Sequence, residues 1–280
     1  MPYRTLDFLN KITFIFQISA VVCHIKDLGE TKIDLLKAAL LIAGGKPAGL
    51  ESYPWNVQFL NSGAMCAASI LTKKTVLTAG HCFDFNKNIG DMTILAASRY
   101  IFDHHRQQQN VWDFRIHPDY NTSAIFSDDI AIIFIEDMFV FDRHVQPANL
   151  VNTDRWMRET GTTFIATGWG QTLEDGELSF RGLMEAKLRF ITRKECLKEY
   201  EGVIFSHDMF CLYGNGTSDT CKGDSGGAIL WNNMIVGIVS HGKGCLKYPG
   251  VYSNVYYYTG WITNTTEELF QKYCRFQAFG

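Results

Sequence analysis

The sequence lacks the features that mark several common classes of protein. No CxxC pair occurs among its eight cysteines, so a zinc site is not indicated and disulfide bonds are the better explanation. The charge is nearly balanced, with a net charge of −3 and a pI of about 6.2. This balance gives no indication of binding to nucleic acid or to an anionic membrane surface. The chain also has no internal repeat and no low-complexity tract.

Long apolar runs are scarce as well. The run at Ile12–Val22 has eleven residues and three polar interruptions, which is short for a membrane span and typical of a signal-peptide core. No later stretch is apolar for long enough to cross a bilayer. We therefore expect residues 1–23 to be the signal peptide of a secreted, extracellular protein without stable membrane insertion; a buried N-terminal helix is the alternative. Three Asn-X-Ser/Thr triplets are candidate glycosylation sites and fit secretion: Asn121, Asn215 and Asn264.

The middle of the chain has the pattern of an all-β protein. Between residues 42 and about 264, short apolar or alternating runs are separated by turn residues. The clearest runs are Trp55–Leu60, Ala68–Leu71, Thr75–Leu77, Ile130–Ile135, Thr163–Thr167, Ala228–Leu230 and Ile235–Val239. Strands spaced this closely favour a barrel or sandwich over βαβ units. Tyr257–Lys272 instead has apolar side chains at helical spacing, which predicts a short C-terminal helix.

Three dispersed motifs contain the residues of a nucleophilic site. The segment Gly223–Gly227 places Ser225 between glycines, where a hydroxyl is accessible; a polar glycine-rich turn is the other explanation. A serine needs a base with a near-neutral pKa, and that imidazole needs a carboxylate to orient it. His81 follows one strand-like run, and either Asp128 or Asp129 opens another.

With these residues in the order His, Asp, Ser, the chain resembles the trypsin/chymotrypsin-type serine proteases over about residues 42–265. The resemblance implies two six-stranded antiparallel β-barrels, near residues 42–148 and 149–264 of a peptidase domain at 42–280, with the active site between them. It makes His81 the general base and acid, Asp129 its orienting carboxylate and Ser225 the nucleophile. The N–H groups of Gly223 and Ser225 would form the oxyanion hole, with Ser240 supporting the carboxylate.

The resemblance also implies how the cysteines pair. The three implied disulfides are Cys66–Cys82, Cys196–Cys211 and Cys221–Cys245. Cys23 and Cys274 are left over. A further bridge of many relatives is missing, because its positions hold Phe164 and Trp231. We expect these two aromatic rings to pack together in its place.

The resemblance further predicts the specificity. Asp219, six residues before Ser225, corresponds to the base of the primary pocket, and glycines at positions 242 and 250 leave that pocket open. A buried carboxylate needs a cation, so we predict an endopeptidase that cleaves protein or peptide substrates after Arg or Lys. The implied substrate-contacting residues are Asp219, Thr220, Lys222, Ser240, His241, Gly242, Gly250 and Phe126. His241 stands where most relatives carry a tryptophan, and Lys222 should disfavour basic residues just past the cut.

The family pattern also implies a zymogen. Residues 24–41 would be a propeptide, and cleavage would free Ile42 to pair with Asp224. Leu41 precedes the cut where relatives usually have Arg or Lys, so a chymotrypsin- or elastase-like activator is one route. Cleavage after Lys37 followed by removal of two dipeptides is the other. Expected partners are substrates, an activating protease and protein inhibitors, with no metal or cofactor. The alternative function is a non-catalytic homologue that acts as a binding or regulatory protein.

Overall fold

The structure, a computed structural model, describes residues 44–101, 103, 107–159, 161–171 and 182–279. The chain divides into two units, Met1–Leu40 and Leu41–Gly280, and every described residue belongs to the second. The expected signal peptide, the expected propeptide and Ile42 lie outside the described residues. The fold below is therefore that of the second unit.

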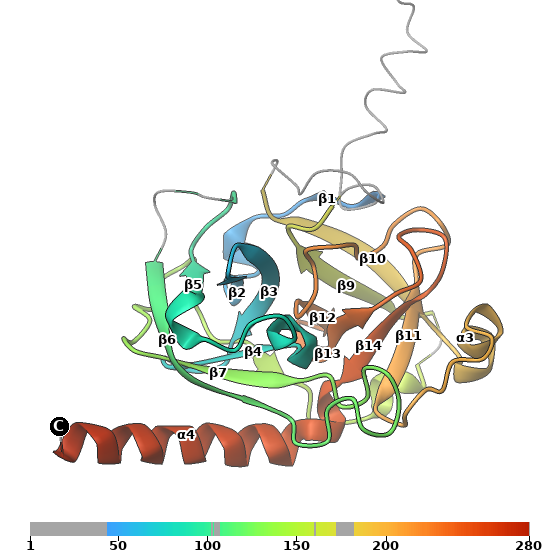
Figure 1. The fold of residues 1–280 in the computed structure, drawn as a ribbon. Helices are drawn as coiled ribbons and strands as arrows, with labels where there is room; N and C mark the ends of the chain where they lie inside the picture. The colour runs from blue at the N-terminus through green and yellow to red at the C-terminus, as the bar shows by residue number, and fades with distance from the viewer. Residues whose placement is uncertain (1–43, 102, 104–106, 160, 172–181, 280) are drawn as a thin grey trace, which may run out of the picture. The chain divides into compact units, whose positions relative to one another are not determined.

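The first half of this unit is a closed antiparallel barrel (Figure 1). Its strands are β2 (Asn56–Asn61), β3 (Ala64–Ile70), β4 (Thr75–Thr78), β5 (Met92–Ala96), β6 (Gln107–Ile116) and β7 (Ala131–Ile135), in the order β2-β3-β4-β7-β6-β5. Thr78 at the end of β4 pairs with Ala131 at the start of β7. This register brings the residues that follow β4 and those that precede β7 to the same edge of the barrel, where His81 and Asp129 meet.

The second half is also a closed six-stranded barrel, which agrees with the expected fold. Its strands are β9 (Thr163–Gly168), β10 (Met184–Ile191), β11 (Met209–Tyr213), β12 (Ala228–Trp231), β13 (Met234–His241) and β14 (Gly250–Asn254). The antiparallel pairs β9–β10, β10–β11, β11–β14, β14–β13, β13–β12 and β12–β9 close the ring. Two short strands attach to it: β1 (Lys46–Pro47) pairs with β10, and β8 (Asn149–Leu150) runs parallel to β13.

In the described ranges of the chain, two α-helices lie outside the barrels. The helix α3 (Arg193–Glu199) begins at a capping box, in which Thr192 and Glu195 satisfy each other's backbone N–H groups. The helix α4 (Thr259–Phe279) starts two residues later than predicted, because a 3₁₀ turn occupies the preceding residues, and it continues past Lys272. The 3₁₀ turns are η2 (Leu50–Ser52), η3 (Gly80–Phe83), η4 (Ile89–Asp91), η5 (Arg155–Met157) and η6 (Val255–Tyr258).

Two aromatic-rich cores fill the barrels. The structure corrects one expectation about the second core, because no ring contact joins Phe164 and Trp231 within the described residues, although both are buried in it. Phe164 instead lies edge-on to Trp156, with 5.8 Å between ring centroids. Trp156 also packs on Phe210 at 4.7 Å. The ring that packs against Phe164 is therefore that of Trp156 in η5, and not that of Trp231 as expected.

The structure forms three disulfides among the residues that it describes, and they are those that the resemblance implies. Cys66–Cys82 links β3 to η3, Cys196–Cys211 links α3 to β11, and Cys221–Cys245 joins two loops of the second half. Each closes a loop of 15 to 24 residues, and closures of this kind stabilise a fold by about 2–4 kcal/mol. Cys274 is an exposed free cysteine on α4. In the described part of the chain, no helix is both long and apolar enough to span a membrane.

Candidate active site

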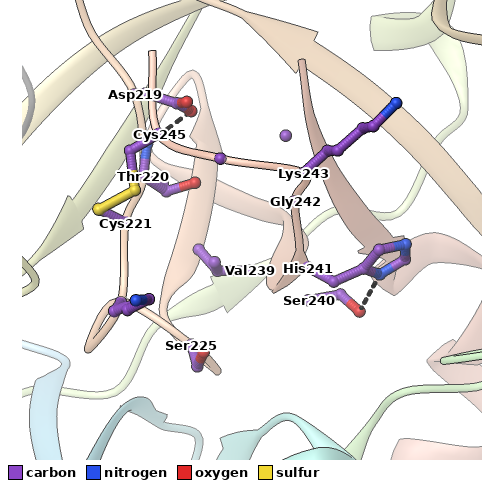
Figure 2. Close-up of a pocket in the computed structure, with 13 residues that line it drawn as sticks. Asp219, Thr220, Cys221, Ser225, Val239, Ser240, His241, Gly242, Lys243 and Cys245 are labelled. Carbon is purple, nitrogen blue, oxygen red and sulfur yellow. Dashed lines mark hydrogen bonds between the residues drawn. A yellow bond between two sulfur atoms is a disulfide. The ribbon is translucent and has the colours of Figure 1, made fainter. Parts of the chain in front are cut away.

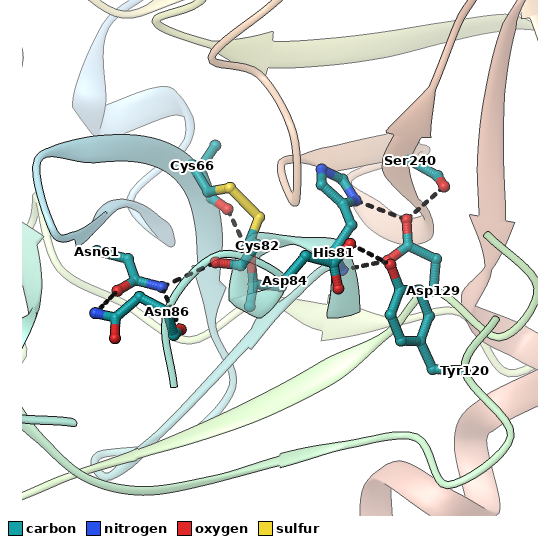
Figure 3. Close-up of a disulfide and its surroundings, with 11 residues drawn as sticks. Asn61, Cys66, His81, Cys82, Asp84, Asn86, Tyr120, Asp129 and Ser240 are labelled. Carbon is teal, nitrogen blue, oxygen red and sulfur yellow. Dashed lines mark hydrogen bonds and ion pairs between the residues drawn. A yellow bond between two sulfur atoms is a disulfide. The ribbon is translucent and has the colours of Figure 1, made fainter. Parts of the chain in front are cut away.

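His81 and Asp129 form a doubly hydrogen-bonded pair at the edge of the first barrel. The His81 backbone N–H donates to Asp129 Oδ1, and its ring Nδ1 lies 2.8 Å from Asp129 Oδ2 (Figure 3). Gly80 permits this approach, because a Cβ there would lie 3.3 Å from Asp129 Oδ1 and closer still to Ile116 and Tyr120. Asp128 points elsewhere and accepts a hydrogen bond from Tyr258, so the geometry selects Asp129 as the partner of His81.

The environment of this pair favours charge on both members. Burial alone would raise the pKa of Asp129, but the charge of His81 and hydrogen bonds from His81 and Ser240 lower it below its usual value. Burial likewise opposes charge on His81, yet the Asp129 carboxylate, with a contribution from Asp84, raises the pKa of the imidazole. Because the Asp129 carboxylate can only accept, His81 must carry a proton on Nδ1, which leaves Nε2 free to act as a base.

Side chains of the second barrel complete the surroundings of Asp129. Ser240, near the end of β13, donates its hydroxyl to Asp129 Oδ2 at 2.5 Å (Figure 3). Ser253 in β14 donates to the Asp129 backbone carbonyl at 2.9 Å. The carboxylate is fully buried, so both barrels contribute to holding it in place.

Ser225 lies in a loop of the second half that docks onto the first barrel. Its carbonyl accepts a hydrogen bond from the Ala67 N–H at 2.8 Å. A Cβ on Gly226 would lie 2.1 Å from Thr78 Oγ1, so only glycine allows the loop to approach the strand that leads to His81. Within the described residues, no hydrogen bond joins Ser225 Oγ to the His81 ring. Such contacts often tighten only when substrate binds.

The amides next to this serine are available to a ligand. Across the part of the chain that the structure describes, neither the Gly223 N–H nor the Ser225 N–H donates a hydrogen bond. Gly223 has a φ of +97°, a conformation that favours glycine. Two unpaired N–H groups beside a serine hydroxyl match the requirement for binding an oxyanion.

A cavity of about 320 Å³ leads from Ser225 to Asp219 (Figure 2). Figure 2 shows these two residues at opposite ends of the pocket. Asp219 is buried and accepts hydrogen bonds from the N–H groups of Thr220 and Leu246, at 2.8 and 2.7 Å. Burial raises its pKa to about 7, although both N–H donors oppose this shift. No ion pair neutralises Asp219 within the described residues.

Most of the substrate-contacting residues that the sequence indicated line this pocket, but Phe126 is not among its lining residues. Thr220, Lys222, Ser240, His241, Gly242 and Gly250 all line the cavity. A Cβ on Gly242 would meet only Tyr200 Oη, at 4.0 Å, whereas one on Gly250 would lie 2.4 Å from Tyr252 Oη. The sequence did not indicate Val239, Lys243 and Gly244, which also line the cavity, or Leu246, whose N–H reaches Asp219. The sequence carried no signal for Leu246, because its φ of +68° is unusual for leucine.

His241 and Phe126 form an aromatic contact beside His81. Their rings stack with centroids 4.8 Å apart, and the Phe126 ring also lies 5.7 Å from the His81 ring. Phe126 adopts a left-handed φ of +60°, a strained conformation that is common near functional sites. Burial lowers the pKa of His241 to about 4, so this histidine is neutral near pH 7.

Asp224 occupies a small cradle of backbone behind the serine. Its carboxylate accepts hydrogen bonds from the Gly170 and Cys221 N–H groups, at 2.7 and 2.9 Å. A Cβ on Gly168 or Gly170 would lie 2.0 or 2.4 Å from its oxygens. Burial raises its pKa to about 6, against the effect of the two donors, and no cation pairs with it within the described residues.

The remaining candidate residues lie apart from this constellation. Asn121, Asn215 and Asn264 are all exposed. Cys66, His81 and Cys82 lie close enough together to hold a metal ion, but the two sulfur atoms are bonded to each other and do not offer thiolate ligands.

Comparison with known proteins agrees with this geometry. A family model described as Trypsin matches residues 42–262. Trypsin I-P1 of Gallus gallus is 32% identical over 232 residues, which cover 80% of this chain and 88% of that protein. Serine protease 1 of Homo sapiens is 32% identical over 230 residues, covering 80% and 89%. Trypsin epsilon of Drosophila erecta is 31% identical over 233 residues, covering 81% and 88%. This chain therefore belongs to the trypsin family of serine proteases.

Proposed function

We propose that this serine protease is an endopeptidase that cleaves after Arg or Lys and is made as a secreted zymogen. The observation that carries the specificity is the buried Asp219 at the end of the pocket that opens at Ser225. Within the described residues it has hydrogen bonds but no counter-ion, so a guanidinium or ammonium group from a substrate would supply the missing charge.

The catalytic steps follow from the arrangement around Ser225. His81 Nε2 takes the hydroxyl proton as Ser225 Oγ attacks the peptide carbonyl, and Asp129 stabilises the resulting imidazolium. The Gly223 and Ser225 N–H groups bind the oxyanion. His81 then returns the proton to the leaving amine, and an acyl-enzyme forms. Water, activated by the same imidazole, hydrolyses the ester and regenerates the hydroxyl.

Zymogen activation is supported by the unpaired charge of Asp224. Its carboxylate is buried, without a cation among the described residues, and a free N-terminal ammonium at Ile42 would neutralise it. Gly44, two residues after Ile42, packs so tightly on the Thr217 carbonyl that a Cβ would lie 1.4 Å from that oxygen. N-terminal sequencing of secreted protein tests this step, and a mature chain that begins at any residue other than Ile42 contradicts it.

Secretion is supported by the disulfides and by the exposed candidate glycosylation sites, since the expected signal peptide lies outside the described residues. Three disulfides persist best in an oxidising compartment. All three asparagines of the candidate glycosylation triplets are exposed. Residues 1–23 would be the signal peptide, residues 24–41 the propeptide and residues 42–280 the peptidase domain. Mass measurement of secreted protein before and after glycosidase treatment tests which asparagines are modified.

The central experiment profiles cleavage of a peptide library by protein processed at Ile42. We expect hydrolysis after Arg and Lys, and an Asp219→Ser variant should lose about 30- to 5,000-fold in kcat/KM on those substrates. A fluorophosphonate probe should label the protein and should not label Ser225→Ala. Equal turnover of Phe or Ala substrates, unchanged in Asp219→Ser, contradicts the specificity. Absence of labelling after correct processing favours a non-catalytic binding protein.

A further inference from the structure

We propose that His241 is a positioning residue that acts on the base His81 through a chain of hydrogen bonds. The chain runs from His241 Nδ1 to Ser240 Oγ at 3.1 Å, and from Ser240 Oγ to Asp129 Oδ2 at 2.5 Å. It ends with His81 Nδ1, which lies 2.8 Å from the same carboxylate oxygen. This inference rests on the proposed function, since it assigns the regulation of that same catalytic base.

The direction of each bond follows from the available protons. Asp129 is held in its ionised form, so it accepts from both Ser240 and His81. Ser240 has a single hydroxyl proton, which it gives to Asp129. Its oxygen can therefore only accept from His241, and the neutral His241 imidazole must carry its proton on Nδ1. A tryptophan or phenylalanine at this position would lack a donor at that atom.

Aromatic packing fixes the His241 ring in the orientation that this chain needs. Phe126 stacks on one face with an interplanar angle of 24°, and Phe205 meets the ring edge-on at 6.5 Å. Figure 2 shows His241 beside Ser240 on the pocket wall, with the hydrogen bond between them. The ring therefore has two roles that substitutions can separate. It packs against aromatic side chains, and its Nδ1–H donates to the hydrogen-bond chain.

His241 does not act on the pKa of His81 through a charge of its own. Its pKa lies near 4, because burial outweighs the attraction of Asp129 and Asp208, and repulsion by His81 acts in the same direction as burial. Asp84 is a further charged group whose carboxylate raises the pKa of His81. His241 is therefore neutral where the His81 imidazole titrates, and it acts through the N–H dipole alone.

The sign of the effect follows from hydrogen-bond cooperativity. Donation by His241 makes the Ser240 hydroxyl a stronger donor to Asp129. A carboxylate that is better stabilised attracts the His81 imidazolium less, so the His241 N–H lowers the pKa of His81. Removing that N–H should raise the pKa of His81 by roughly a few tenths of a unit. The acid limb of the kcat/KM profile should then move to higher pH.

Two substitutions separate the donor from the ring. His241→Phe keeps the stacking surface and removes Nδ1–H, so we expect the acid limb of kcat/KM to shift upward. His241→Asn places an amide N–H the same number of bonds from the backbone as Nδ1 but removes most of the ring. We expect its acid limb to stay at the wild-type pH, while KM rises through loss of the aromatic wall. His144→Phe, which removes a histidine that pairs with exposed Glu51, is the matched control and should leave both quantities unchanged.

The measurement is kcat/KM against pH on one substrate selected from the peptide library, with active sites titrated by the fluorophosphonate probe. Asp219 also titrates in this range, but it does so in wild type and variants alike, so the difference between their acid limbs reports His81. If wild-type protein labels normally but the acid limb of His241→Phe moves by less than about 0.1 unit, the inference is wrong while the proposed function stands. Equal shifts in His241→Phe and His241→Asn also overturn it, because they would assign the effect to the ring. Failure of wild-type protein to label contradicts the proposed function itself.

Discussion

At the scale of single residues, the ionisation of Asp219 makes the affinity of the pocket for a cationic ligand depend on pH. Its pKa of about 7 means that the Asp219 carboxyl of the empty pocket is largely protonated in mild acid. A cationic ligand needs the ionised form, so binding must remove the proton. Affinity for benzamidine, a small amidinium probe, should therefore rise roughly tenfold per pH unit up to about pH 7 and then level off.

Isothermal titration calorimetry between pH 5 and pH 8 measures this dependence directly. Asp219→Asn is the control, and it should bind weakly with little change across the range. Constant affinity of the wild-type protein from pH 5 to pH 8 would mean that Asp219 is already ionised in the empty pocket.

Gly242 offers a second prediction at this scale. A Cβ at this position meets no protein atom closer than 4.0 Å, so a larger side chain would extend into the open pocket without disturbing the fold. Gly242→Val should reduce kcat/KM on Arg and Lys substrates at least about tenfold while leaving the melting temperature nearly unchanged. Steady-state kinetics and thermal melting measure the two effects. Equal losses on Arg and Ala substrates would argue that the wall does not face the substrate side chain.

At the scale of elements, α4 is attached to the first barrel by an unusual set of contacts. Lys74 in the loop before β4 is buried, and its Nζ lies 3.8 Å from the centre of the Tyr273 ring on α4. The same ring packs edge-on against Trp112 of β6, and Lys272 pairs with Asp113 at 2.6 Å. The amphipathic helix thus covers a buried cation, whose other described partners include main-chain carbonyls.

Removing the Tyr273 ring should destabilise the fold, because the buried Lys74 would lose its aromatic partner. We expect Tyr273→Ala to lower the free energy of unfolding by roughly 2–4 kcal/mol. Urea denaturation followed by fluorescence measures it. Tyr273→Phe retains the ring and should be close to wild type, and Phe270→Ala, at a half-exposed position of the same helix, should cost less than about 0.5 kcal/mol. A small effect of Tyr273→Ala would show that solvent reaches Lys74 easily.

The elements also show where sequence reasoning succeeded. Each of the seven apolar runs overlaps a strand, because strands such as β7, with every residue buried, leave a continuous apolar signal. The strands that were missed include β6, in which only Val111 is buried. Half-exposed strands keep polar side chains, so their pattern resembles that of a loop. The strand pattern alone did not decide between a barrel and a sandwich. The prediction of two barrels came from the resemblance to the family.

At the scale of the molecule, Asp224 links activation to stability. Its pKa in the folded state, about 6, lies above the ordinary value of 3.8. The folded form therefore binds more protons than the unfolded form between these values, and its stability falls as pH rises through this window. For unprocessed protein we expect Asp224 to contribute a loss of about 2 kcal/mol between pH 4 and pH 7.

Comparison with Asp224→Asn isolates this contribution, because the amide does not titrate. Chemical denaturation at several pH values should show a steeper decline for the unprocessed wild type than for the variant. After cleavage at Ile42, the proposed ammonium partner would lower the pKa of Asp224, and the difference in slope should disappear or reverse. Identical slopes in the unprocessed proteins would mean that Asp224 is already neutralised before cleavage.

Much of the site was predictable because its motifs are local in sequence. His81, Asp129, Ser225 and Asp219 each stand in a recognisable short segment. The structure pairs His81 with Asp129 and places Ser225 and Asp219 on one pocket. The bond from His241 to Ser240 was not predictable, because it depends on ring orientation set by distant aromatic residues. The same holds for the Asp224 cradle, where the absence of side chains on Gly168 and Gly170 matters only after folding.

The division of the site between two barrels has a consequence for how the molecule acquires activity. His81 and Asp129 belong to one barrel, whereas Ser225 and Ser240 belong to the other half, and the two halves meet through bonds such as Ala67 N–H to Ser225 C=O. During refolding, strand formation and even native-like spectra in each half would precede any turnover. Recovery of hydrolysis would therefore report the docking of two finished halves, a later event than the folding of either one.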